Sequence, residues 1–160
     1  MYNIVSDTQK YSQFIPFCTS SDKRLLTSST FKSTLTLKAP IEFTYESIVT
    51  LFPSKISALC LEQALFKSLK TTWTFKPLYK NLSRIQIDLD YELSFGVYSP
   101  IAKLIVPSLS STYINAFMKR AQALHGNPTT PNQIINLEGS NLTDLERRNL
   151  MVYATLYKSQ

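Results

Sequence analysis

One long segment with helical periodicity stands near the end of a chain whose earlier part alternates like β-strands. Between Tyr98 and Gly126 the apolar residues recur at helical spacing and form one stripe. This stripe consists of Leu109, Tyr113, Ile114, Phe117, Met118, Ala121 and Leu124. Gly126 and Pro128 are suitable stop signals, and Pro107 predicts a break between a short helix and the long one. A helix with so wide an apolar face needs a sheet against which to bury it.

The chain before residue 96 contains five segments in which apolar and polar residues alternate. These segments are approximately 31–39, 41–51, 56–61, 69–77 and 85–95. In the clearest one, from Ile85 to Phe95, the apolar side chains share one face and Arg, Gln, Asp and Glu share the other. Such alternation is typical of an antiparallel sheet with one buried face and one solvated face. Thr19–Lys23, which has no apolar face, is expected to be a polar link.

The two ends of the chain are both expected to contain short helices. Residues 2–14 have the pattern of two short helices that follow each other. Near the other end, Thr143 and Glu146 have the spacing of a capping box, which favours a helix over about 144–157. A strand over 149–157 is the alternative, because Val, Tyr and Thr suit sheets.

The titratable residues offer no catalytic constellation, and neither a cofactor nor a metal ion is expected. Cys18 and Cys60 have no metal-ligand spacing, and three glycines form no phosphate loop. The single histidine, His125, ends the long helix, where a cation complements the helix dipole. Asp88 and Asp90 alternate on the solvated face of a strand. The net charge of +6 favours an anionic partner such as a membrane surface or nucleic acid, or is simply that of a basic domain.

Large apolar side chains leave two interpretations of the interior, a filled core or a pocket. The inward face of the expected sheet would meet Tyr113 and Phe117 of the helix. Composition alone favours a filled core. The inward-facing residues are Leu35, Leu37, Phe43, Tyr45, Trp73, Leu89 and Tyr91.

The N-terminal segment resembles the mitochondrial coenzyme Q-binding protein family. That family shows a run Y-x-x-V-x-D-V-x-x-Y-x-x-F-hydrophobic-P-aromatic-C, which Tyr2 to Cys18 match, except that Thr8 replaces the second Val. Further matches are EFTYESIV from Glu42, WTFKP from Trp73 and NAFMKRA from Asn115. The similarity covers about residues 1–126 and looks most like a fungal member.

The resemblance implies an α+β helix-grip (START-like) fold, in which an antiparallel sheet wraps around a long C-terminal helix. It implies one lipid-binding domain over residues 1–126, followed by a linker and a short helix over 127–160. The family has a strand before its first helix. We therefore expect that strand to be missing here, which would leave a six-stranded sheet with an exposed edge.

The resemblance also implies a function that is not enzymatic. The family binds ubiquinone or its polyprenyl precursors in an apolar cavity. It acts as a lipid chaperone for coenzyme Q synthesis and respiration, on the matrix side of the mitochondrial inner membrane. A polyprenyl chain gains about 25 cal/mol per Å² from burial, so an apolar cavity suits it. The expected partners are therefore this lipid and an anionic membrane surface, and no nucleic acid.

The expected ligand-binding residues come from the mouth loop, the sheet and the helix. Leu35 and Trp73 match cavity-lining positions of the family, and Pro16 and Phe17 match its loop at the cavity mouth. The full set is Pro16, Phe17, Leu35, Leu37, Phe43, Trp73, Leu89, Tyr91, Tyr113 and Phe117. For the membrane contact we expect a basic region without acids, which contains Lys67, Lys70, Lys76, Lys80 and Arg84. The alternative is that these are scattered charges that only keep the protein soluble.

Two other functions remain open at this point. Bacterial relatives with the same fold include a ribosome-association toxin, which would use the basic charge on RNA. The superfamily also includes aromatase/cyclase enzymes, which would need an acid, a base or an arginine facing the cavity.

Overall fold

The computed structural model describes the backbone and the side chains over different ranges. The backbone is described for residues 1–38, 42–61, 66–79, 82–93, 99–125, 136–139 and 148–157. The side chains are described for residues 1–38, 42–61, 66–77, 84–92 and 112–125.

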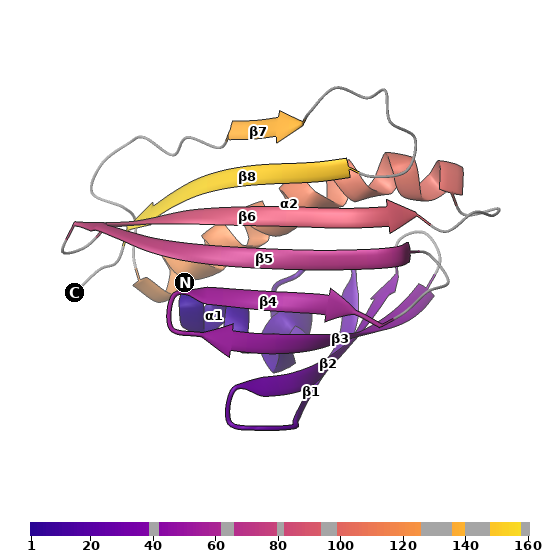
Figure 1. Cartoon of the computed structure of the whole chain (residues 1–160), viewed down its shortest axis with the longest axis horizontal. Coiled ribbons are helices and arrows are strands. Elements are labelled where there is room, and N and C mark those ends of the chain that lie inside the picture. Colours follow the sequence, from indigo (N-terminus) through magenta and orange to yellow (C-terminus); the bar gives the residue numbers. More distant parts are fainter. Residues whose placement is uncertain are drawn as a thin grey trace.

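A strongly curved antiparallel sheet and one long helix make up most of the described chain (Figure 1). Two short helical elements come first, followed by six consecutive strands, the long helix and two further strands. The elements are α1 (Tyr2–Ser6), the 3-10 helix η1 (Thr8–Gln13), β1 (Cys18–Leu25), β2 (Thr30–Lys38), β3 (Glu42–Phe52), β4 (Lys55–Cys60), β5 (Phe66–Tyr79), β6 (Leu82–Leu93), α2 (Ser99–His125), β7 (Asn136–Gly139) and β8 (Arg148–Tyr157).

The strands follow the order β1-β2-β3-β4-β5-β6-β8-β7 across the sheet. The five strands predicted from alternation are confirmed, and in β2 every second residue from Phe31 to Leu37 is buried. β1 is a sixth strand where we expected a polar link at Thr19–Lys23, so that prediction is wrong. Its side chains are mostly exposed, and its backbone pairs with β2 from Leu25 opposite Phe31 to Cys18 opposite Leu37. Backbone hydrogen bonds therefore hold β1 in the sheet without an apolar side of its own.

Residues 148–157 form strand β8, so the predicted helix is wrong there and the alternative, a strand over 149–157, is confirmed. Residues 144–147 lie outside the described part of the chain. β8 pairs along β6 from Leu82 opposite Tyr157 to Tyr91 opposite Arg148. The unpaired N–H and C=O groups at the outer side of β6 favour such an added strand, and Val, Thr and Tyr suit it. The expected six-stranded sheet is wrong too, because the sheet in the described residues has eight strands and β6 is not at its edge.

Helix α2 runs across the concave side of the sheet (Figure 1). It passes through Pro107 without interruption, so the predicted break there is wrong. Proline removes one backbone hydrogen bond and can kink a helix, but it does not have to end one. The second half of α2 buries Ile114, Phe117 and Met118 against the sheet. No helix in the described part of the chain is long and apolar enough to cross a bilayer.

The pairing of β8 with β6 predicts a change in hydrogen exchange when the tail is removed. A chain that ends at residue 147 should lose protection at those β6 amides that bond to β8, because they would then face water. Exchange measured by NMR or mass spectrometry would detect this, and strand β2, which lies between β1 and β3, is the internal control. Unchanged protection across β6 would contradict the pairing.

Candidate functional site

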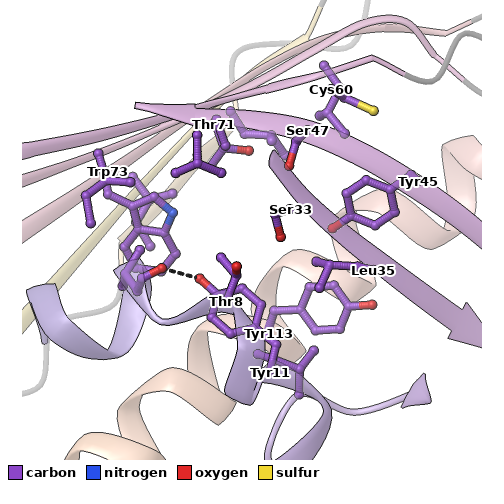
Figure 2. A pocket seen from close by; sticks show the side chains of 18 of the residues that line it. Thr8, Tyr11, Ser33, Leu35, Tyr45, Ser47, Cys60, Thr71, Trp73 and Tyr113 are labelled. Carbon is purple, nitrogen blue, oxygen red and sulfur yellow. Dashed lines mark hydrogen bonds between the residues drawn. The ribbon is translucent and has the colours of Figure 1, made fainter. Parts of the chain in front are cut away.

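A cavity of about 240 Å³ lies between the concave face of the sheet, η1 and helix α2 (Figure 2). The 23 described side chains that line it are all uncharged, and most are aliphatic or aromatic. The alternation of β2 to β6 turns every second side chain toward this space, and the apolar stripe of α2 closes it from the other side. The interior therefore contains a pocket, where composition alone had favoured a filled core.

Seven of the ten predicted site residues line this cavity. They are Leu35, Leu37, Phe43, Trp73, Leu89, Tyr113 and Phe117. The other three, Pro16, Phe17 and Tyr91, are not among its lining residues. Tyr91 is buried beside Phe66, with 6.3 Å between the ring centroids. Whether any of the ten binds a ligand stays a prediction.

The loop between η1 and β1 turns Ile15 inward and Phe17 outward. Ile15 is buried and lines the cavity, whereas Phe17 is 52% exposed. Phe17 has a positive φ of 64°, which is uncommon for a residue other than glycine. Its carbonyl accepts a hydrogen bond of 2.9 Å from the Lys38 amide, which fixes the loop against the end of β2. The predicted mouth loop therefore touches the cavity through Ile15.

A cluster of aromatic rings forms one wall of the cavity around Phe117. The Phe117 ring meets those of Tyr11, Phe14 and Trp73 edge-to-face, at centroid distances of 5.2, 5.3 and 4.9 Å. Trp73 also stacks on Phe75 at 6.5 Å. This cluster connects η1, β5 and α2, and such edge-to-face pairs stabilise beyond their buried area.

Hydroxyl groups of threonine and serine also face the cavity, and none of these residues was among the predicted site residues. Thr8, Ser33, Ser47 and Thr71 line it together with apolar residues (Figure 2). The alternation of β2 and β3 could have identified Ser33 and Ser47, because both occupy inward positions. Tyr11, another lining residue, donates a 2.6 Å hydrogen bond to the carbonyl of Val5.

Burial keeps the cavity tyrosines in their neutral form. Desolvation raises the pKa of Tyr113 to about 12, and a weaker effect of Cys18 acts in the same direction. Desolvation also raises the pKa of Tyr11 and of Tyr45, with further contributions from neighbouring titratable groups. In the described residues, no group of three His, Cys, Asp or Glu side chains could hold a metal ion. The site therefore offers neutral hydrogen-bonding groups inside an apolar enclosure.

The raised pKa of Tyr113 predicts that the protein loses stability at high pH. A tyrosine whose pKa rises on folding contributes its full stability below pH 10.0, the ordinary value, and loses it as the pH rises through about 12. Tyr113→Phe should therefore flatten the decline in unfolding free energy between pH 10 and 12. Urea unfolding at several pH values measures this slope. An identical slope in wild type and variant would contradict the assigned burial.

Comparisons with known proteins agree with this fold. Residues 1–118 match the family described as polyketide cyclase / dehydrase and lipid transport. Among solved structures, an aromatase/cyclase from Streptomyces sp. R1128 has a TM-score of 0.68 at 14% identity and covers 76% of this chain and 84% of its own. A START superfamily protein from Mycobacterium smegmatis has a TM-score of 0.64 at 20% identity, with 77% and 88% covered. The predicted α+β helix-grip fold is confirmed.

The curated relatives of this chain include coenzyme Q-binding proteins and bacterial toxins. The coenzyme Q-binding protein COQ10 of Drosophila melanogaster is 30% identical over 88% of this chain, and the chain spans 60% of the length of that relative. Its Schizosaccharomyces pombe counterpart is 23% identical, with 78% of this chain and 80% of the relative covered. The ribosome association toxin RatA of Vibrio cholerae is 28% identical, with 79% and 88% covered. The predicted resemblance is thus confirmed, and the chain belongs to the polyketide cyclase / dehydrase and lipid transport family.

Proposed function

We propose that this protein binds ubiquinone or one of its polyprenyl precursors and acts as a lipid chaperone for coenzyme Q synthesis and respiration. The observation that carries the proposal is the apolar cavity between the sheet and α2. The similarity to mitochondrial coenzyme Q-binding proteins of fly and fission yeast supports it and supports a mitochondrial location. Within the mitochondrion we propose the matrix side of the inner membrane.

The chemistry of the cavity favours binding over catalysis. Among the described residues, its lining contains no carboxylate, imidazole, amine or guanidinium group that could transfer a proton near neutral pH. We therefore propose a role that is not enzymatic and needs no cofactor. The aromatase/cyclase neighbour, at 14% identity, supports the shared fold alone.

The size of the cavity limits how much of such a lipid it can enclose. Its volume of about 240 Å³ is below the roughly 300–1,000 Å³ of common ligand pockets. This space suits a ring and the first part of an attached chain. The remainder of a long polyprenyl tail would lie in the opening or in a bilayer, which suits a protein that receives its lipid from a membrane.

Lipid extraction from the purified protein, followed by mass spectrometry, tests the proposal. We expect ubiquinone or a polyprenyl precursor to be the main extracted lipid. Leu35→Phe adds volume inside the cavity and should reduce the amount, whereas Leu59→Phe adds the same volume at an exposed site on the sheet. A protein that carries no quinone lipid, even after expression with excess ubiquinone, would overturn the proposal.

A ribosome-associated function is the second candidate, because relatives named as ribosome association toxins are 24–30% identical and the chain spans 80–88% of their length. The net charge of +6 is compatible with RNA binding. This candidate would be favoured if the purified protein carried no quinone lipid and co-sedimented with ribosomes, with binding that weakens steeply as the salt concentration rises.

The predicted basic region bears on the membrane contact, which we keep as part of the proposal. Two of its cations face acids: Lys67 forms a 3.0 Å ion pair with Glu92, and Lys70 lies opposite Asp90. Lys76 and Arg84 lie opposite each other on β5 and β6, and both are exposed. Lys80 lies outside the described residues. This pair of cations is therefore the part of the region best suited to an anionic bilayer.

Charge reversal at one of these positions should weaken vesicle binding. Lys76→Glu should lower binding to anionic vesicles by roughly 1–2 kcal/mol, because one attraction becomes a repulsion. Lys119→Glu, an equal charge change at an exposed position of α2, is the matched control. Co-sedimentation at low and high salt measures both. Equal losses for the two variants would mean that net charge alone governs binding.

A further inference from the structure

Three hydroxyl groups at the cavity wall are buried without a hydrogen-bond partner. They are Thr8 Oγ1, Ser33 Oγ and the Tyr113 hydroxyl. Thr8 is 4% exposed and Ser33 is 1% exposed. Most buried polar side-chain atoms in folded proteins do have a partner, and each unpartnered one calls for an explanation. Three of them around one cavity point to a ligand that supplies the missing partners.

We propose that Thr8, Ser33 and Tyr113 bind the oxygen atoms of a neutral ring head group, which enters the cavity ahead of its apolar chain. The proposal rests on the proposed function, because it assumes that the cavity takes a quinone lipid. It adds the orientation of that lipid and the side chains that recognise its head group.

The three hydroxyls come from three different elements that meet at the cavity. Thr8 belongs to η1, Ser33 to β2 and Tyr113 to α2, and Figure 2 shows them around the same space. The packing of these elements is what brings the three groups together. Ligand oxygens bonded to these groups would connect the N-terminal segment, the sheet and the long helix.

The chemistry of these groups selects a neutral head group. A hydroxyl donates to a carbonyl or methoxy oxygen and also accepts from a ring hydroxyl, so the site suits both a quinone and its reduced quinol. The raised pKa of Tyr113 keeps this phenol protonated and able to donate. A carboxylate or phosphate would meet no cation among the lining residues that the structure describes, and it would lose its hydration. Fatty acids and phospholipids are therefore expected to bind less well.

Three single substitutions each remove one hydroxyl with little change in shape: Thr8→Val, Ser33→Ala and Tyr113→Phe. Each should weaken the binding of decylubiquinone about 3- to 10-fold, the usual effect of one hydrogen bond. Each should also leave the melting temperature of the ligand-free protein unchanged or raise it by about 2–4 °C, because an unsatisfied buried group is gone. Binding is measured by titration calorimetry and melting by circular dichroism.

Tyr2→Phe is the matched control, since the Tyr2 hydroxyl donates a 2.8 Å hydrogen bond to the Phe52 carbonyl and Tyr2 is not among the residues that line the cavity. This variant should lose stability and keep its affinity for decylubiquinone. The three hydroxyl variants are expected to lose affinity but not stability, and the control is expected to lose stability but not affinity. This contrast separates ligand recognition from a purely structural role.

A comparison of three ligands completes the test. Wild-type protein should bind decylubiquinone more tightly than decylbenzene, which lacks the oxygens, and more tightly than decanoate, which is charged. If it binds decylubiquinone but the three variants bind it equally well, the hydroxyl site is wrong while the proposed function stands. Equal binding of decylbenzene and decylubiquinone would have the same meaning. If wild-type protein binds no decylubiquinone, both proposals are overturned.

Discussion

Phe117→Ala should lower the free energy of unfolding by about 3–5 kcal/mol, the usual cost of removing a large buried aromatic side chain. Phe117 is 5% exposed and meets three other rings at centroid distances of 4.9–5.3 Å. Its removal would leave a void that joins the existing cavity and would separate α2 from η1 and β5. Urea denaturation followed by far-ultraviolet circular dichroism measures the loss.

The same substitution should also reduce the retention of a quinone lipid, because Phe117 lines the cavity. Phe52→Ala, at a residue 46% exposed at the end of β3, is the control and should change stability by about 0.5 kcal/mol or less. Phe117→Leu keeps part of the volume and should lose less stability than the alanine variant. A loss below about 1 kcal/mol in Phe117→Ala would contradict the packing described here.

The sequence was sufficient for the parts of the fold that a local pattern determines. Alternation identified β2 to β6, because each of these strands has one face on the core and the period of two follows directly from strand geometry. β1 has no such face, since it is held by backbone pairing with β2 and leaves most side chains exposed. β8 depends on pairing with β6, which lies more than 50 residues earlier in the chain. A local pattern does not show such a distant partner, and the capping-box spacing near this segment therefore favoured a helix.

The candidate site likewise contains residues that a local pattern predicts and properties that it does not. Leu35, Leu37 and Trp73 could be placed on the cavity wall from alternation, together with the family resemblance. Ser33 occupies the same face of β2, but a serine within an alternating strand gives no signal that its hydroxyl lacks a partner. That property depends on η1 and α2, which close over the strand. The outward turn of Phe17 likewise depends on a backbone conformation that the sequence pattern does not specify.

Trp73 offers the most direct spectroscopic test of where a ligand lies, because it is the single tryptophan of the chain. Its ring lines the cavity and packs on Phe117 and Phe75, so it serves the wall and the core together. A quinone that lies against the indole should quench its fluorescence. Titration with decylubiquinone should therefore reduce emission in step with the binding that calorimetry reports.

Substitution of Trp73 separates its two roles. Trp73→Ala should lower the unfolding free energy by about 3–5 kcal/mol and should also reduce the quinone lipid carried through purification. Trp73→Phe keeps an aromatic wall, so it should retain more stability and more lipid than the alanine variant. If Trp73→Ala loses the lipid and Trp73→Phe retains as much lipid as the wild type, an aromatic wall is sufficient for binding. Calorimetry shows when the wild-type protein is saturated with the quinone. If tryptophan emission is then unchanged, the quinone ring lies away from Trp73 and outside the aromatic cluster around Phe117.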